Sequence, residues 1–283
     1  MEEGLGVREI KSEAIASRIA EMCVRANTVL PSDVLSALKT ARLEEDGEIA
    51  RNVLDVILEN ARQADPLPIC QDTGMACVFL EIGQDVHISG DLTSAVNRGV
   101  AQGYTEGYLR KSVVRDPLRR ENTGDNTPAL LYTELVPGES IRITVAPKGF
   151  GSENMSRIAM LKPSDGAQGV MRFVMDTVRE AGPNPCPPIV VGVGIGGSFD
   201  KAAFLAKKAL LRPLGDRNPD TFYADMERTL LHEINSLGIG PQGLGSRTTA
   251  LDVLIESMPT HIAGLPCAVN INCHVARHVT EVL

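Results

Sequence analysis

The sequence predicts an α+β protein, with a helix-rich N-terminal segment followed by a mixed sheet with flanking helices. Up to about residue 65, apolar residues recur at helical spacings of three and four. Beyond that point, short apolar or alternating runs typical of strands are interleaved with helical patterns. The hydrophobic fraction of 43% and the charged fraction of 23% are typical of folded globular proteins. We therefore expect one domain over residues 1–283, with a helical part over about 1–65 and an α/β part over about 66–283.

Three helices are predicted in the N-terminal part. The second follows Pro31, and Pro66 with Pro68 ends the third, because proline cannot continue a helix. The apolar positions that mark the three helices are Ile10, Ala14, Ile15, Ile19 and Met22; Val34, Leu35 and Leu38; and Ile49, Val53, Ile57 and Ala61.

The α/β part alternates between the two patterns. Runs that alternate polar with apolar over 130–135 and 140–146, with Pro137-Gly138 between them, predict a β-hairpin. The other predicted strands cover residues 76–82, 189–193, 250–258 and 262–271. The predicted helices cover residues 92–113, 167–181, 201–211 and 221–236.

Charge and hydropathy exclude several classes of partner. The formal net charge of −8 and the lack of a basic run argue against nucleic acid. No run approaches the roughly 20 apolar residues that a membrane span requires. Residues 1–20 mix charged and apolar side chains, unlike a signal peptide. We therefore expect a cytoplasmic protein whose thiols stay reduced.

Three of the six cysteines, Cys70, Cys186 and Cys273, lie in turn-like surroundings far apart in the chain. Three thiolates from distant loops can hold a metal cluster and leave one metal position open to a substrate. The alternative is that each cysteine is a small buried hydrophobe. Cys77 and Cys267 fall in strand-like runs, and Cys23 falls on a helical apolar face. These three cysteines are therefore expected to be buried.

The glycine-rich segment Gly192–Gly197 fits the pattern G-x-G-x-x-G, follows an apolar strand and precedes a helix. It supports a different class of function, a dinucleotide-binding oxidoreductase. Against this, a dinucleotide-binding domain usually begins with the motif and continues with further strand–helix alternation, whereas in this chain helices dominate the segments after the motif. The glycines can instead allow close backbone approach beside a cluster, or tight packing of helix on strand with no ligand.

Together, five motifs resemble the alpha region of the class I fumarase and tartrate dehydratase family of iron–sulfur hydro-lyases. The resemblance covers nearly the whole chain, in the family's order, with one departure where Phe150 replaces a glycine that many members have. The matching segments are Ile69–Gly74, Arg120–Ala129, Pro147–Asn154, Gly192–Ser198 and His261–Pro266, the last running into Cys273–His278.

The resemblance implies a [4Fe–4S] cluster held by Cys70, Cys186 and Cys273, with one iron not ligated by cysteine. It also implies that Asp72 belongs to the acid–base machinery. An isolated arginine is usually a solvated surface residue; the resemblance favours Arg110 over its rivals Arg115, Arg119 and Arg120, and a guanidinium suits a carboxylate. The implied substrate-binding residues are Gln71, Asp72, Arg110, Gly151, Asn154 and His261.

The reaction that the resemblance implies is the reversible hydration of a small dicarboxylate. Fumarate and (S)-malate, a pair of the tricarboxylic acid cycle, are the leading substrates; L-tartrate is the alternative and a mesaconate-type substrate is a smaller possibility. Single-chain members continue with a second domain, whereas this sequence stops at Leu283. We therefore expect the alpha subunit of the two-subunit form, completed by a separate beta subunit, with homo-oligomerisation of the heterodimer.

Overall fold

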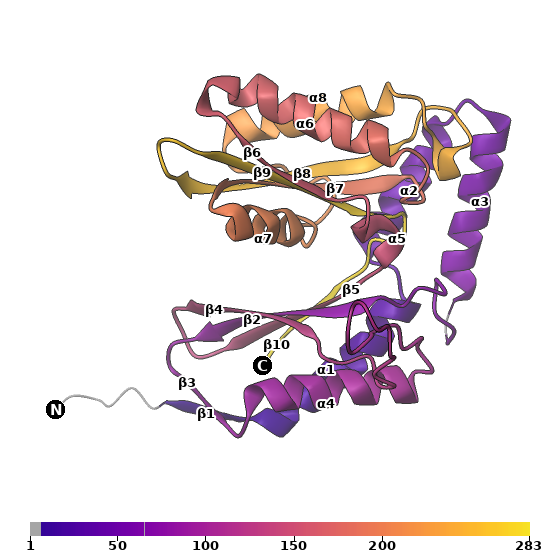
Figure 1. Ribbon diagram of the computed structural model, residues 1–283. Helices are drawn as coiled ribbons and strands as arrows, with labels where there is room; N and C mark the ends of the chain where they lie inside the picture. Colours follow the sequence, from indigo (N-terminus) through magenta and orange to yellow (C-terminus); the bar gives the residue numbers. More distant parts are fainter. Residues whose placement is uncertain (1–6, 65) are drawn as a thin grey trace. The chain divides into compact units, whose positions relative to one another are not determined.

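Two compact units make up the chain in the computed structural model, which describes residues 7–64 and 66–283 (Figure 1). Unit 1 comprises Met1–Leu30, Ala64–Gly149 and Arg277–Leu283, and unit 2 comprises Pro31–Gln63 and Phe150–Ala276. The secondary structure confirms the predicted α+β class. The helix-rich N-terminal segment is divided, because its first helix belongs to unit 1 and the next two to unit 2.

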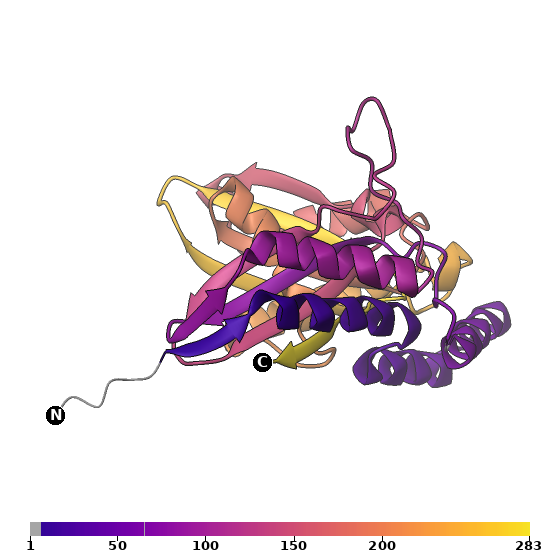
Figure 2. The ribbon, with the colours of Figure 1, turned by 90° about the horizontal axis from the view of Figure 1, so that it is seen from below.

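Unit 1 is built on a four-stranded mixed sheet in the order β10-β5-β2-β4. The strands are β2 (Met75–Gly83), β4 (Leu130–Val136), β5 (Ile141–Lys148) and β10 (Val279–Val282). Helices α1 (Ser12–Thr28) and α4 (Leu92–Glu106) lie side by side and pack on one face of this sheet (Figures 1 and 2). A small parallel sheet joins β1 (Arg8–Lys11) to β3 (Val86–Ser89).

The predicted β-hairpin between residues 130–135 and 140–146 is wrong. Both strands exist, but β2 lies between them, parallel to β4 and antiparallel to β5. The turn that contains Gly138 closes around the end of β2: the Gly83 and Asp85 N–H groups donate to the Ser140 and Gly138 carbonyls at 2.9 and 3.0 Å. Alternation identifies a strand and its buried face, but it does not identify the neighbouring strand.

Two element boundaries also differ from the predicted ones. The helix expected to reach Val113 ends at Glu106, because Gly107 caps it and Tyr108 adopts a positive φ of 52°. The strand expected from Ile262 begins at Leu265, after a turn that contains Gly264. Several short strands have patterns too weak to predict from the sequence. One of them is β10, whose four residues form one edge of the unit 1 sheet.

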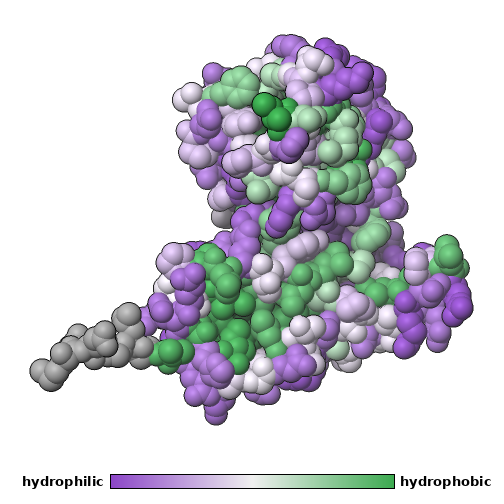
Figure 3. All heavy atoms as spheres, turned by 60° about the vertical axis from the view of Figure 1, so that its left-hand side comes forward, coloured by the Kyte–Doolittle hydropathy of each residue, from purple (hydrophilic) through white to green (hydrophobic). Residues whose placement is uncertain are grey.

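The surface of unit 1 carries exposed apolar side chains. Hydrophobic residues gather in a patch on this unit in the space-filling view of Figure 3. Leu135 and Val282, on the two edge strands β4 and β10, are 74% and 55% exposed. No helix in the described part of the chain is both long and apolar enough to cross a membrane.

Unit 2 contains a second four-stranded mixed sheet, in the order β6-β9-β7-β8. Helices α6 (Gly166–Ala181) and α8 (Thr221–Asn235) cover one face, and α7 (Phe199–Ala209) covers the other (Figure 1). The strands are β6 (Arg157–Leu161), β7 (Ile189–Gly197), β8 (Ala250–Thr260) and β9 (Leu265–Asn272). The unit also contains short helix α5 (Phe150–Glu153) and the turns η1 (Pro163–Asp165) and η2 (Pro241–Gly243).

The N-terminal helices of unit 2 are held by a buried carboxylate. They are α2 (Ser32–Glu44) and α3 (Glu48–Gln63), and Glu45 lies between them, 2% exposed. Its side chain accepts hydrogen bonds from the Ser246 hydroxyl and from the Arg247 and Thr248 N–H groups. This network fixes the α2–α3 connection to the loop that precedes β8.

The glycine-rich segment lies inside β7 rather than in a phosphate-binding turn. A Cβ atom at Gly192 would overlap the Ala206 carbonyl oxygen, and one at Gly194 would overlap the Ala202 carbonyl oxygen. These glycines therefore let the backbone of α7 approach the strand. Their packing role removes the main support for the dinucleotide-binding alternative.

Substituting alanine for Gly194 is expected to destabilise the protein by at least about 2 kcal/mol, because overpacking a tight core contact forces the backbone apart. Thermal unfolding should show the effect as a lower Tm. Gly264→Ala is a matched control, since the nearest atom to a Cβ there lies 3.8 Å away. Equal Tm values for the two variants would contradict the packing role.

Candidate functional site

The Cys70 turn of unit 1, residues 69–74, is held from its inner side by buried donors. The Tyr104 hydroxyl on α4 lies 2.6 Å from the Thr73 carbonyl oxygen and 3.0 Å from that of Gly74. The Asn126 amide donates to the Gly74 carbonyl at 3.1 Å. Gly74 has a φ of 74°, and a Cβ there would lie 2.7 Å from the Lys148 backbone. Only glycine fits that position, so the sequence Asp72-Thr73-Gly74 specifies this turn.

Asp72 presents a half-buried carboxylate at the turn. Its Oδ1 accepts the Gly74 N–H at 3.0 Å, which orients the side chain. A Cβ built at Gly149 would lie 3.3 Å from Oδ2, so a side chain at position 149 would crowd that oxygen. The carboxylate is thus oriented and only half-buried, which suits a group that exchanges protons with a substrate.

Gln71 and Arg110 flank the same turn. The Thr73 hydroxyl donates to the Arg110 carbonyl oxygen at 3.0 Å, which fixes the Arg110 backbone beside the turn. Both side chains are exposed, and neither the Gln71 amide nor the Arg110 guanidinium has a hydrogen-bond or ion-pair partner among the residues that the structure describes. Unit 1 therefore brings together four predicted site residues: Cys70, Gln71, Asp72 and Arg110.

Asn126 supports this arrangement and was not singled out from the sequence. It is fully buried and has a φ of 65°. Its Oδ1 accepts the Ser112 and Val113 N–H groups at 2.7 and 3.2 Å, while its amide donates to Gly74. Its residue type is the signal that could have identified it: Asn126 ends the polar turn Asn122–Asn126, and asparagine tolerates a left-handed backbone.

Asn126→Ala is expected to destabilise the chain by about 3 kcal/mol, because it leaves buried backbone groups of Gly74, Ser112 and Val113 without partners. Denaturant unfolding would measure the loss. Asn122→Ala, in the same loop but exposed, should cost under about 1 kcal/mol. A smaller loss at Asn126 than at Asn122 would contradict the supporting role.

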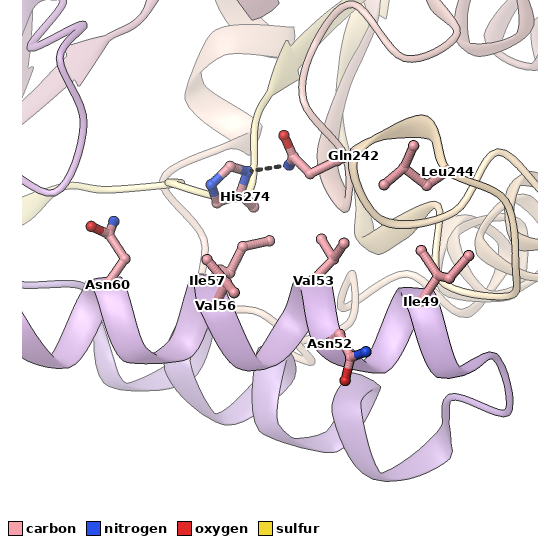
Figure 4. Close-up of a pocket in the computed structure, with 9 residues that line it drawn as sticks. All are labelled: Ile49, Asn52, Val53, Val56, Ile57, Asn60, Gln242, Leu244 and His274. Carbon is pink, nitrogen blue, oxygen red and sulfur yellow. Dashed lines mark hydrogen bonds between the residues drawn. The ribbon is translucent and has the colours of Figure 1, made fainter.

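The loops that carry Cys186 and Cys273 meet in unit 2. The His274 backbone N–H donates to the Cys186 carbonyl at 3.3 Å, and His274 Nδ1 lies 3.0 Å from the same oxygen. Gln242 Nε2 lies 3.1 Å from His274 Nδ1 and donates to the Pro187 carbonyl at 2.8 Å (Figure 4). Gln242 and His274 thus connect two cysteine loops that are 87 residues apart in the sequence.

A hollow of about 510 Å³ borders His274 in the same unit (Figure 4). Most of its wall is the apolar side of α3, completed by Leu244. Its lining residues are Ile49, Asn52, Val53, Val56, Ile57, Asn60, Gln242, Leu244 and His274. The lining contains no lysine or arginine, so this hollow is a poor site for a dicarboxylate.

The burial of the cysteines divides them as predicted. Cys23, Cys77 and Cys267 are buried. Burial raises the pKa of Cys23 and of Cys267 to about 12, so both remain thiols at neutral pH and are unsuited to ligate a metal. Cys70 and Cys273 are half-buried and Cys186 is exposed.

The accessible cysteines have the chemistry that a thiolate-held metal cluster requires. The accessible cysteines are the three that the sequence singled out, and two of them lie on adjoining loops of unit 2 while Cys70 belongs to unit 1. Over residues 7–64 and 66–283, no three histidine, cysteine or acidic side chains form a group that could by itself hold a metal ion.

Helix α5 contains Gly151, Asn154 follows it directly, and both lie near the end of β9 that precedes Cys273. Glu153 anchors it: the Lys207 ammonium and the Asn270 amide both donate to its carboxylate at 2.7 Å. Asn154 is exposed, and its amide has no hydrogen-bond partner within the described residues. A Cβ at Gly151 would meet no atom of the described residues within 4 Å, so packing among those residues does not require glycine there.

His261 lies away from the other predicted residues of unit 2. It is exposed in the turn between β8 and β9, where the Ala263 N–H donates to its Nδ1 at 3.2 Å. Cys273 follows the opposite end of β9, a strand of 8 residues. At strand geometry this separates the two side chains by roughly 25 Å. The structure therefore does not bring His261 and Cys273 of one chain to a common small-molecule site.

Residues 16–282 match the sequence model of the family described as "Fumarate hydratase (Fumerase)". A Methanocaldococcus jannaschii protein with the name "Putative L(+)-tartrate dehydratase subunit alpha" is 46% identical over 277 residues, which cover 94% of this chain and 96% of that protein. The "L(+)-tartrate dehydratase subunit alpha" of Escherichia coli K12 is 33% identical over 267 residues, covering 93% of this chain and 88% of the relative. The Shigella sonnei protein of the same name shows the same values.

Proposed function

Because the chain belongs to the fumarate hydratase (Fumerase) family, we propose that it is the alpha subunit of an iron–sulfur hydro-lyase for a small dicarboxylate. The observation that carries the proposal is the Cys70 turn of unit 1. It combines an accessible cysteine with an oriented carboxylate, a neighbouring amide and an adjacent guanidinium that has no partner within the described residues.

Cys70, Cys186 and Cys273 would hold the [4Fe–4S] cluster, because they are the accessible cysteines of the chain. When bound, the cluster supplies Lewis acidity at the iron that no cysteine ligates. The compartment that suits such thiolates is the cytoplasm, where the redox poise keeps cysteines reduced.

The chain's own residues supply binding and proton transfer. Asp72 would accept a proton from the substrate in one direction and return it in the other, since its half-buried carboxylate is oriented by the Gly74 N–H. Arg110 binds a substrate carboxylate through a charge-assisted pair of hydrogen bonds. Gln71, Asn154 and the backbone at Gly151 are the proposed further donors to substrate oxygens.

Two substrates are candidates for this chemistry. Fumarate, hydrated to (S)-malate in the tricarboxylic acid cycle, agrees with the description of the family. L-Tartrate is the second candidate, favoured by the names of the M. jannaschii and E. coli relatives. The substrates differ by hydroxyl groups, so discrimination depends on hydrogen bonds to those groups.

A separate beta subunit completes the proposed enzyme, which the relatives' names as alpha subunits support. The test is to purify the chain alone and with a candidate beta subunit, and to assay both anaerobically with fumarate and with L-tartrate. We expect turnover of one substrate by the pair and little or none by the chain alone. Turnover by the chain alone would contradict the need for a partner, and inactivity of a stable pair on both substrates would contradict the proposed substrates.

The position of His261 supports homo-oligomerisation of the heterodimer. If His261 contacts substrate, it must do so in the site of a second copy, because Cys273 of its own chain lies roughly 25 Å away along β9. Mixing His261→Ala chains with Cys273→Ser chains tests this, since a mixed oligomer would contain one intact site. Recovery of activity in the mixture is expected; two inactive variants that stay inactive when co-assembled would contradict the shared site.

A further inference from the structure

Arg277 is a buried cation with unsatisfied hydrogen-bonding capacity. It is 5% exposed and lies four residues after Cys273. Its Nη2 donates to the Asp72 carbonyl oxygen, but Nε and Nη1 are buried without a hydrogen-bond partner in the described part of the chain. A buried charge that lacks a counter-ion is costly, so an arginine in this setting points to an anion that the described residues do not supply.

The Asp72 contact places Arg277 in the inner support of the Cys70 turn. Three successive carbonyl groups, those of Asp72, Thr73 and Gly74, all face buried donors: Arg277 bonds the first, and Tyr104 lies within hydrogen-bonding distance of the other two. Burial raises the pKa of the Tyr104 hydroxyl, and the nearby Arg277 charge opposes that rise. Tyr104 is therefore a neutral donor and cannot neutralise Arg277.

We propose that Arg277 is a positioning residue that holds the Cys70–Asp72 turn through the Asp72 carbonyl and supplies the buried positive charge for an anionic metal–thiolate group bound at Cys70. The inference rests on the proposed function, in which Cys70 is a cluster ligand. It explains why Nε and Nη1 have no hydrogen-bond partner among residues 7–64 and 66–283, since their charge complements the thiolate-held group. It also explains how a chain of net charge −8 provides a local cation where one is needed.

Arg277→Met is expected to affect the metal-free chain and the iron-loaded chain differently. In the metal-free chain, the variant removes a buried charge that has no counter-ion in the described part of the structure, so the Tm should stay the same or rise. In the loaded chain, the variant should lose iron to a chelator at least about tenfold faster, as expected when a residue supporting a metal ligand is removed. Arg277→Lys keeps the charge without the planar fork and should fall between the wild type and Arg277→Met.

The experiment reconstitutes each protein anaerobically with iron and sulfide and measures iron release to a chelator. Amide hydrogen exchange of residues 69–74 in the metal-free chains reports positioning independently of iron, and at least about tenfold faster exchange is expected for Arg277→Met. The matched control is Arg98→Met, an exposed arginine on α4 of the same unit, which should behave as the wild type.

Unchanged iron release and unchanged exchange in Arg277→Met would overturn the proposal. A lower Tm for metal-free Arg277→Met, with Arg277→Lys no better in iron retention, would overturn it in favour of a purely structural arginine. If the wild type takes up no iron, the proposed function fails together with the charge-complement role. Amide hydrogen exchange of residues 69–74 then tests the positioning role by itself. Exchange at the wild-type rate in Arg277→Met would overturn that role.

Discussion

Replacing Asp72 with asparagine is expected to lower kcat of the assembled enzyme about 10³-fold while leaving KM within a few-fold. The amide keeps the size of the side chain, and its oxygen can still accept the Gly74 N–H, so the turn should hold its shape. What is lost is the ability to take up a proton. Initial rates with the favoured substrate, measured on the alpha–beta pair, would show the effect.

Two controls separate this loss of chemistry from a loss of structure. The iron content of Asp72→Asn should match that of the wild type, because the amide oxygen can still accept the Gly74 N–H and the carbonyls of the Cys70 turn keep their buried donors. Asp85→Asn, an exposed carboxylate of the same unit, should be fully active. More than a tenth of wild-type kcat in Asp72→Asn would remove Asp72 from the acid–base role.

Arg110→Met is expected to lower kcat/KM about 100-fold, mainly through a higher KM. A hydrogen bond to a charged group contributes about 1.5–3 kcal/mol, and the guanidinium can form two with one carboxylate. The Tm should not change, because the side chain is exposed and has no partner within the described residues. Arg110→Lys should recover part of the loss, since it restores the charge but not the paired geometry.

Arg119→Met is the matched control for Arg110, because Arg119 is an exposed arginine of the same unit and a rival for the same role. Its kcat/KM should equal that of the wild type. A loss at Arg119 without one at Arg110 would transfer the carboxylate-binding role to the loop over residues 115–120.

Local patterns predicted most of the elements because local physics determines them. The spacing of Ile15, Ile19 and Met22 marks the buried face of α1, and all three are essentially inaccessible. The same reasoning separated Cys23, Cys77 and Cys267, which lie on apolar faces, from the three cysteines in turns. Burial follows from periodicity, so these predictions needed no knowledge of the tertiary structure.

Long-range pairing could not be predicted in this way. The insertion of β2 between β4 and β5 leaves the alternation of each strand unchanged, so the sequence pattern is the same with or without a hairpin. The division of the N-terminal helices between two units depends on contacts such as Glu45 with Ser246, which are 201 residues apart. No local signal reports such contacts.

The residues that support the candidate site were the hardest to predict from the sequence. Asn126, Tyr104 and Arg277 act on the Cys70 turn from positions 30 to 205 residues away, through hydrogen bonds to its carbonyls. The predicted site residues, by contrast, carry recognisable chemistry themselves. His261 shows the limit of that approach, because its chemistry suits a substrate while its place at the far end of β9 separates it from Cys273.

The most direct test of the proposed cluster is the iron and acid-labile sulfide content after anaerobic reconstitution. The wild type should hold about four irons per chain, the number in a [4Fe–4S] cluster. Cys70→Ser, Cys186→Ser and Cys273→Ser should each lose most of the metal, whereas Cys77→Ser, at a buried position, should keep it. Full iron in any of the three variants, or no iron in a wild type that instead binds a nicotinamide nucleotide tightly, would contradict the cluster and its three ligands.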